Sequence, residues 1–228
     1  MLAALVGLGL LAGCGSHSPP AALATQNTQS DRPALPAPDP VLNGPERHVL
    51  ALGDSLFAGF GLRPEQAYPQ QLAAALRARG VNVRVSNAGV SGDTTADGLA
   101  RLNFTLASQP QPPDLVLICL GGNDMLRGLP VAQTRATLAA ILEKLQQRRI
   151  PVLLMGMLAA PNLGKTYAAS FNAIYPTLAR QYRAGLVPFF LKAVIDRPDL
   201  RQADHIHPTA SGVDAMVKST EGKVLAAL

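Results

Sequence analysis

Val49-Leu50-Ala51-Leu52-Gly53-Asp54-Ser55-Leu56 is the stretch that decides the fold of this chain. Its first four residues form a continuous apolar run, which is typical of a strand buried on both faces. A glycine then permits a tight turn. A serine that opens the next helix presents its hydroxyl at the edge of the sheet, and its own N–H has no partner within the helix. The stretch therefore predicts a strand-to-helix turn that carries an exposed serine.

Strands and helices are predicted to alternate along the rest of the chain. Apolar or β-branched runs predict strands over residues 49–53, 81–87, 114–121, 151–157 and 186–190. Apolar residues at helical spacing predict helices over residues 65–79, 131–149 and 167–184, and Gly80 is a predicted C-terminal cap of the first. Continuous apolar strands joined by helices indicate a parallel sheet covered on both faces. The predicted fold class is therefore α/β, a three-layer α/β/α sandwich.

The N-terminal residues are predicted to lie outside this fold. Residues 1–13 are apolar apart from glycines, too short for a membrane span, and typical of a signal peptide. Leu11-Ala12-Gly13-Cys14 resembles the lipobox of bacterial lipoproteins, which implies a lipidated Cys14. The absence of Lys or Arg after Met1 departs from that pattern, and the alternatives are a plain cleaved secretory signal or a hydrophobic tail on a cytosolic protein. The lipoprotein interpretation predicts a membrane-anchored protein of the bacterial cell envelope, on the periplasmic side.

Composition limits what the remaining chain can be. Residues 14–46 are rich in Pro, Ser and Ala and are predicted to be a tether, which leaves one domain at residues 47–228. After Cys14 only Cys119 remains, inside an apolar run, which excludes a disulfide framework and a cysteine-zinc site. The net charge of +5 comes from scattered Lys and Arg. This distribution gives nucleic-acid binding little support, although it suits an anionic lipid surface, and no obligate protein partner is indicated.

Polar and glycine residues follow four of the predicted strands. Because ligands bind at the carboxyl ends of parallel strands, these residues are expected to share one edge of the sheet. They fall in four short motifs: Gly53-Asp54-Ser55-Leu56, the run from Asn87 to Thr94 with Gly89, Gly121-Gly122-Asn123-Asp124, and Asp204-His205-Ile206-His207-Pro208.

These residue types suit acyl transfer by a nucleophilic serine. A serine hydroxyl is a weak nucleophile until a base removes its proton, and the neutral imidazole of His207 can do so for Ser55. Asp204 can accept the other ring N–H and stabilise the imidazolium that forms. The N–H groups of Ser55 and Gly89 and the amide of Asn123 are candidate donors to an oxyanion, each worth about 3 kcal/mol when correctly aimed.

Other interpretations of the same residues are structural. Asp54, Asp93 and Asp124 are expected to bond nearby backbone and shape turns, with a second carboxylate catalyst as the alternative for Asp54. His205 with His207 and Asp204 lacks further ligands nearby, so no metal site is predicted. No cofactor is predicted either. A flavodoxin-like nucleotide- or flavin-binding module is the non-enzyme alternative, but the acidic Asp54 stands where such a module would bind phosphate.

The four motifs, in this order, resemble those of the SGNH, or GDSL, hydrolase family over most of residues 49–228. Further stretches, such as Leu99-Ala100-Arg101-Leu102 and Leu126-Arg127-Gly128, resemble the bacterial branch of acyl-CoA thioesterases, lysophospholipases and arylesterases. The resemblance implies a flavodoxin-like sheet of about five strands and a serine esterase without cofactor, acting on a small acyl ester or thioester. Ser55 would be the nucleophile, His207 the base and Asp204 its orienter, with Ser55, Gly89 and Asn123 as the oxyanion hole. Residues 157–167 correspond to the variable loop beside the acyl groove of the family. A carbohydrate or peptidoglycan O-acetyl esterase of the same superfamily is the alternative.

Overall fold

A computed structural model describes residues 41–228. Cys14, the predicted signal peptide and residues 14–40 of the predicted tether lie outside the described residues. The first strand, β1 (Asn43–Gly53), begins upstream of residue 47, the predicted start of the domain.

Five parallel strands form one sheet in the order β2-β1-β3-β4-β5. The predicted strands are all present, with ends that differ by a few residues. The four that follow β1 are β2 (Val81–Gly89), β3 (Leu115–Cys119), β4 (Val152–Met155) and β5 (Gly185–Val187). The central strands are buried because helices cover both faces of the sheet, and Leu50, Leu52 and Cys119 are fully buried. This arrangement confirms the predicted α/β/α sandwich.

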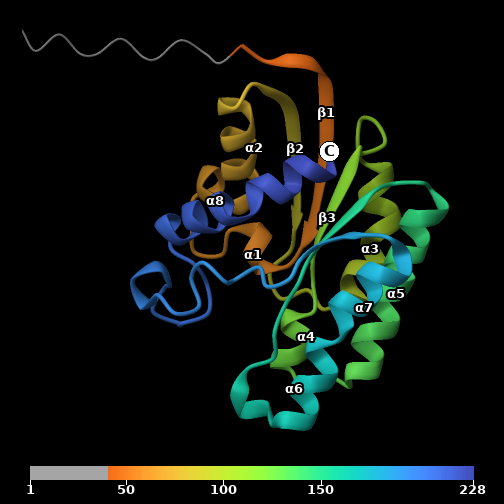
Figure 1. Cartoon of the computed structure of the whole chain (residues 1–228), viewed down its shortest axis with the longest axis vertical. Helices are drawn as coiled ribbons and strands as arrows, with labels where there is room; N and C mark the ends of the chain where they lie inside the picture. The colour runs from red at the N-terminus through yellow and green to blue at the C-terminus, as the bar shows by residue number, and fades with distance from the viewer. Residues whose placement is uncertain (1–40) are drawn as a thin grey trace, which may run out of the picture. The chain divides into compact units, whose positions relative to one another are not determined.

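Helices lie in two layers against the sheet (Figure 1). One layer holds α2 and α8, which are joined by a hydrogen bond of 2.7 Å between the hydroxyls of Tyr68 and Thr220. The other layer holds α3, α5 and α7. The α-helices are α1 (Ser55–Ala58), α2 (Tyr68–Ala78), α3 (Thr95–Ala107), α4 (Gly122–Leu126), α5 (Val131–Gln147), α6 (Lys165–Asn172), α7 (Ile174–Tyr182) and α8 (Ala210–Ala227).

The helices depart from the sequence-based expectation in their ends, their division and their number. The helix expected from residue 65 begins only at Tyr68, after a 3₁₀ turn at Pro64–Gln66. The helix expected over residues 167–184 is two helices, since Pro176 has no N–H to donate to the preceding turn. Helices α3, α4 and α8 were not predicted. Helix α3 is marked by a capping box between Thr94 and Asp97.

The predicted cap at Gly80 is confirmed, because Gly80 has a φ of 81° directly after α2. Within residues 41–228, no helix has the length and apolar character needed to cross a membrane.

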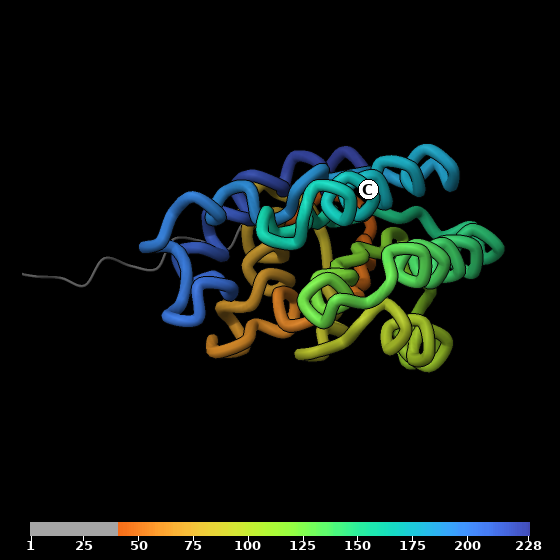
Figure 2. Tube along the Cα trace, turned by 90° about the horizontal axis from the view of Figure 1, so that it is seen from below, coloured from red at the N-terminus to blue at the C-terminus, as the bar shows by residue number. Residues whose placement is uncertain are grey.

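Chain segments far apart in the sequence meet beside α1. Figure 2 shows the blue C-terminal part of the chain returning to the orange part that follows β1. A hydrogen bond from Gln202 to the Phe60 carbonyl oxygen, 2.7 Å long, joins the two. The fold thereby brings the last of the four motifs to the first.

Candidate active site

Ser55 is the first residue of α1, directly after the turn that ends β1. Asp54 is the N-cap of this helix, and its Oδ1 accepts a hydrogen bond of 3.0 Å from the Leu56 N–H. Gly53 is required for space rather than for a left-handed backbone, since a Cβ there would lie 2.6 Å from Phe57 and 2.9 Å from the Cys119 carbonyl oxygen. Close packing of α1 on the end of β1 therefore fixes where the serine hydroxyl points.

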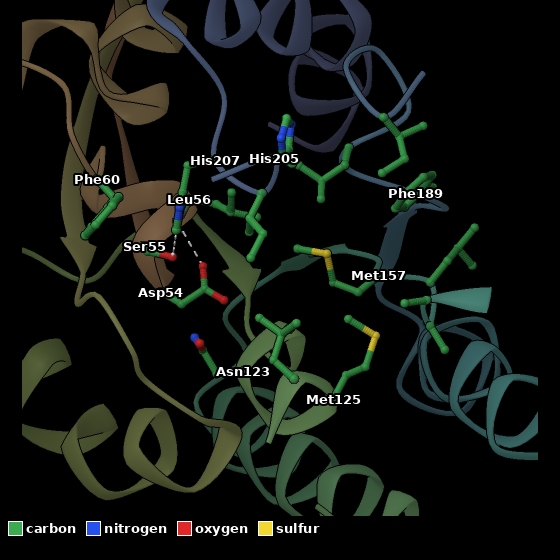
Figure 3. Close-up of a pocket in the computed structure, with 18 of the residues that line it drawn as sticks. Asp54, Ser55, Leu56, Phe60, Asn123, Met125, Met157, Phe189, His205 and His207 are labelled. Carbon is green, nitrogen blue, oxygen red and sulfur yellow. Dashed lines mark hydrogen bonds between the residues drawn. The ribbon is translucent and has the colours of Figure 1, made fainter. Parts of the chain in front are cut away.

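Ser55, His207 and Asp204 lie in hydrogen-bonding order. Figure 3 shows the His207 ring at the Ser55 hydroxyl. The His207 Nε2 is 2.8 Å from the Ser55 Oγ, and the His207 Nδ1 is 2.7 Å from the Asp204 Oδ2. A carboxylate only accepts hydrogen bonds, so the proton of the neutral ring lies on Nδ1 and Nε2 accepts from the serine. The structure thus brings together the three predicted catalytic residues in the geometry that proton removal from Ser55 requires.

Asp204 is held in its ionised form. Desolvation opposes ionisation, but hydrogen bonds from the His207 ring and from the N–H groups of His207 and Ile206 outweigh it and lower the pKa of Asp204 to about 2. The two backbone bonds to the Asp204 Oδ1 are 3.0 and 2.9 Å long. They fix the carboxylate so that its other oxygen faces the imidazole.

His205 lines the same cavity as His207 but makes different contacts within the loop. Its backbone is left-handed, with a φ of 60°, its N–H donates to the Gln202 carbonyl oxygen, and its own carbonyl oxygen accepts from Arg201. The imidazole that bonds Ser55 is that of His207. In the part of the chain that the structure describes, no three His, Cys, Asp or Glu side chains gather in a way that could hold a metal ion.

Two of the three predicted oxyanion donors lie at the cavity. Ser55 and Asn123 both line it, and Figure 3 shows the Asn123 amide near Ser55. The Asn123 Nδ2 also donates a bond of 2.9 Å to the Asp93 carbonyl oxygen, which sets the orientation of the amide. One N–H of this amide is held in place and the second is left for a substrate oxygen.

Gly89, the third predicted donor, is not part of the cavity wall. It is still paired with Gly53 at the end of β2, and its N–H donates to the Asn87 Oδ1 at 2.9 Å. A Cβ at this position would collide with the backbone of Phe57 and Ala58, so the glycine serves the packing of β2 on α1. The chain reaches the cavity only after the turn that follows Gly89.

Gly92 is the glycine of this loop that the structure brings to the cavity. It lines the wall, has a φ of 88°, and its N–H has no acceptor among residues 41–228. The sequence did carry a signal for it, because Gly92 is followed by Asp93 and by Thr94, the N-cap of α3.

Two aspartates brace this edge of the sheet, mainly through side chains rather than through the nearby backbone expected from the sequence. Asp93 pairs with Arg101 at 2.6 Å, and Arg101 also donates to the Gly53 carbonyl oxygen at 2.9 Å. Asp124 is buried and accepts from the Thr95 N–H, the Thr95 hydroxyl and the Thr134 hydroxyl. In the sequence, Arg101 belongs only to a stretch that resembles the family. The structure shows that it joins β1 to the Asp93 loop.

The cavity in front of Ser55 has a volume of about 570 Å³ and mostly apolar walls. Met125 and Met157 lie on the side away from Ser55 (Figure 3). Residues 157–161, from the predicted variable loop, form part of the wall. The further apolar residues that line it are Leu56, Phe60, Leu126, Leu158, Ala159, Ala160, Pro161, Phe189, Leu191, Ile195 and Ile206.

The pH dependence of the free energy of unfolding tests the effect of burial on Asp54. Burial raises the pKa of Asp54 from 3.8 to about 7, despite the hydrogen bond from Leu56. Between these pH values the unfolded chain binds fewer protons than the folded protein, so the free energy of unfolding falls as pH rises and levels off above about pH 7. Asp54→Asn keeps an acceptor for the Leu56 N–H and removes this titration. We expect it to raise the free energy of unfolding at pH 8 by on the order of 1–4 kcal/mol and to flatten the pH dependence.

Urea unfolding at pH 4.5, 6 and 8 measures this effect. Asp97→Asn is the opposite control, because hydrogen bonds from Thr94 lower the pKa of Asp97 and its ionised form stabilises the fold above the unfolded pKa. This variant should lose stability at pH 8. Parallel profiles for Asp54→Asn and the parent protein would contradict the burial argument.

Comparison with known proteins identifies the family. The model of the GDSL-like Lipase/Acylhydrolase family matches residues 51–215. The esterase TesA of Pseudomonas aeruginosa is 40% identical over 171 residues, which are 75% of this chain and 84% of that protein. Thioesterase 1/protease 1/lysophospholipase L1 of Escherichia coli (strain K12) is 42% identical over 160 residues, 70% of this chain and 74% of that protein.

Solved structures agree with this assignment. The crystal structure of AlinE4, a SGNH-hydrolase family esterase, matches with a TM-score of 0.70 at 58% identity and covers 82% of this chain and 98% of that chain. A crystal structure of TesA matches with a TM-score of 0.75 at 38% identity, over 80% of this chain and 100% of that chain. Since the matched family region runs from β1 into α8 and contains Ser55, Asp204 and His207, the chain belongs to the GDSL-like lipase/acylhydrolase family and is a serine ester hydrolase.

Proposed function

We propose that this enzyme hydrolyses carboxylic esters and thioesters of apolar acyl chains through an acyl intermediate on Ser55. The observation that carries the proposal is the hydrogen-bonded Ser55, His207 and Asp204 at one side of a large apolar cavity. Related proteins named esterase, arylesterase and thioesterase 1/lysophospholipase L1 support the substrate class.

The first half of the reaction forms the acyl intermediate. As the Ser55 Oγ attacks the substrate carbonyl carbon, its proton passes to the His207 Nε2 and Asp204 stabilises the imidazolium. The negative charge that develops on the carbonyl oxygen is stabilised by the N–H groups of Ser55 and Gly92 and by the Asn123 amide. The bond from carbon to the leaving oxygen or sulfur then breaks, and His207 returns the proton to the alcohol or thiol.

The second half releases the acid. His207 removes a proton from a water molecule, whose oxygen attacks the acyl carbon, and the carbon–Oγ bond breaks as His207 returns the proton to Ser55. The ionised Asp204 is needed in both halves. Its pKa of about 2 keeps it charged wherever the imidazole is neutral.

The walls of the cavity favour an acyl chain longer than acetyl. Each methylene that leaves water for an apolar wall contributes about 0.8 kcal/mol, close to a factor of four in binding. We therefore expect kcat/KM for p-nitrophenyl esters to rise at least about tenfold from acetyl to the middle chain lengths. A series from acetyl to palmitoyl esters, with palmitoyl-CoA and an acetylated glycan, measures this. Highest activity on the acetylated glycan, with no hydrolysis of longer esters, would instead show an O-acetyl esterase.

A pair of variants separates the cavity from general surface effects. Leu158 lines the cavity and is 41% exposed, whereas Phe104 lies on α3 outside it and is 78% exposed. Leu158→Ser should reduce kcat/KM for decanoyl esters more than for acetyl esters. Phe104→Ser should leave the ratio between the two substrates unchanged.

We further propose that the mature enzyme is a lipoprotein of the bacterial cell envelope, anchored through Cys14 on the periplasmic side. The support is the apolar run of residues 1–13 that ends in Leu11-Ala12-Gly13-Cys14. Mass spectrometry of the N-terminal peptide from membrane fractions should find an acylated cysteine at residue 14, and Cys14→Ser should release the protein from the membrane. An unmodified N-terminus at another residue would refute the anchor.

A further inference from the structure

The bond between Ser55 and His207 depends on how two distant loops are joined. The serine loop, residues 54–62, follows β1, and the histidine loop, residues 201–209, precedes α8. The two bonded side chains are 152 residues apart in the sequence, and their atoms are 2.8 Å apart. A small shift of one loop against the other would lengthen this bond without disturbing the core.

Gln202 joins the two loops through one side-chain amide. Its Nε2 donates to the Phe60 carbonyl oxygen of the serine loop at 2.7 Å and to the Pro208 carbonyl oxygen of the histidine loop at 2.9 Å. A primary amide has two N–H donors, so both are used, one on each loop. The backbone N–H of Gln202 also donates to the His207 carbonyl oxygen at 2.8 Å.

The serine loop leaves space for the side-chain amide of Gln202. Gly61, with a φ of 71°, has no Cβ, and a Cβ there would collide with the Gln202 Oε1. The ring of Phe60 lies against the His207 ring, with centroids 4.4 Å apart and planes tilted by 32°. Figure 3 shows Phe60 beside His207, so the residue whose carbonyl oxygen is bound by Gln202 also contacts the catalytic imidazole.

We infer that Gln202 is a positioning residue, which holds the imidazole of His207 within hydrogen-bonding distance of Ser55 by tying Phe60 to Pro208. The inference rests on the proposed function in one respect, that His207 is the base for Ser55. Gln202 is absent from the cavity wall, so its loss removes no side chain that would contact the acyl group and acts through the alignment of the reacting groups. Misalignment of about 1 Å can cost on the order of 10²-fold in rate.

Two substitutions of Gln202 test this role. Q202M keeps the length of the side chain and removes both donors, and Q202E replaces the donors with a carboxylate that faces two carbonyl oxygens. At pH 8 we expect kcat for a p-nitrophenyl ester to fall about 10- to 100-fold in both variants, with KM within about twofold of the parent. The rate at which a small organophosphonate reacts with Ser55 should fall by the same factor, since that reaction needs the activated serine and no acyl site.

The pH dependence separates positioning from a general loss of structure. A protonated carboxyl group has one O–H donor, so the deficit of Q202E relative to the parent should shrink between pH 8 and pH 5.5. The deficit of Q202M should stay constant over the same range. A loop that had simply come apart would give the same pH-independent deficit in both variants, together with a raised KM, and that result would overturn the inference.

Gln71 supplies matched controls. Its Nε2 also donates to a backbone carbonyl oxygen, that of Glu65, at 2.8 Å, and neither residue is part of the cavity wall. Q71M and Q71E should match the parent in kcat, KM and pH dependence. If Ser55→Ala is inactive while both Gln202 variants keep the parent kcat, the inference about Gln202 fails and the proposed function stands. If Ser55→Ala retains activity, the proposed function itself fails.

Discussion

Ser55→Ala is expected to reduce ester hydrolysis by at least about 10⁴-fold, to the level that an oxyanion hole and binding alone provide. The Ser55 hydroxyl is the only group bonded to the His207 Nε2 among the described side chains, so no neighbouring oxygen is placed to replace it. The methyl group leaves the Asp54 cap and the Gly53 turn unchanged. Stability should therefore stay within about 0.5 kcal/mol of the parent.

Steady-state kinetics with a p-nitrophenyl ester measure this loss, and mass spectrometry after reaction with an organophosphonate shows whether residue 55 is modified. Ser219→Ala is a suitable control, because within residues 41–228 the Ser219 hydroxyl bonds only a carbonyl oxygen of α8. That variant should keep the parent rate. Activity of Ser55→Ala within tenfold of the parent would mean that another residue is the nucleophile.

His207→Ala is the second large effect, expected at about 10³-fold or more in kcat/KM. The variant has no base at the Ser55 Oγ and no group to return a proton to the leaving atom. His205→Ala should stay within a few-fold of the parent, because the His205 ring is not the one that bonds Ser55. The two histidines are alternate residues of one loop, so each is a control for the other.

The low pKa of Asp204 gives a prediction for the parent protein. Because the pKa of Asp204 is lowered to about 2, its protonation does not affect activity above about pH 3. Any fall of kcat/KM between pH 8 and pH 4 should therefore come from groups other than Asp204. A larger loss of kcat/KM in His205→Ala than in His207→Ala would show that the assignment of the base is wrong.

The sequence determined the parts of this protein that depend on local pattern. Apolar or β-branched runs predicted all five strands. The central strands β3 and β4 are apolar throughout because they are buried on both faces. The order of strands and helices predicted a parallel sheet, and motifs at strand ends predicted one site. Ser55, Asp204, His207 and Asn123 all followed from this rule, since the carboxyl ends of parallel strands meet at one edge.

Helices α3 and α8 were harder to predict than the strands. Helix α8 follows the histidine loop, and its buried face is formed partly by Gly212 and Thr220, which weakens the apolar pattern. The apolar pattern of helix α3 is weakened in the same way by Thr95, Gly98 and Thr105 on its buried side. Small and hydroxyl-bearing residues therefore share these interfaces with apolar side chains such as Leu102 and Val213.

Only the tertiary structure decided which glycine reaches the cavity and what joins the two loops. Gly89 and Gly92 lie in one stretch of eight residues, and their difference depends on the paired end of β2, which no local pattern reveals. The role of Gln202 likewise depends on Phe60, 142 residues away, and on the space that Gly61 leaves. Sequence patterns specify which residues are apolar, turn-forming or reactive. Distances between residues far apart in the chain are set by packing, and a catalytic site depends on those distances.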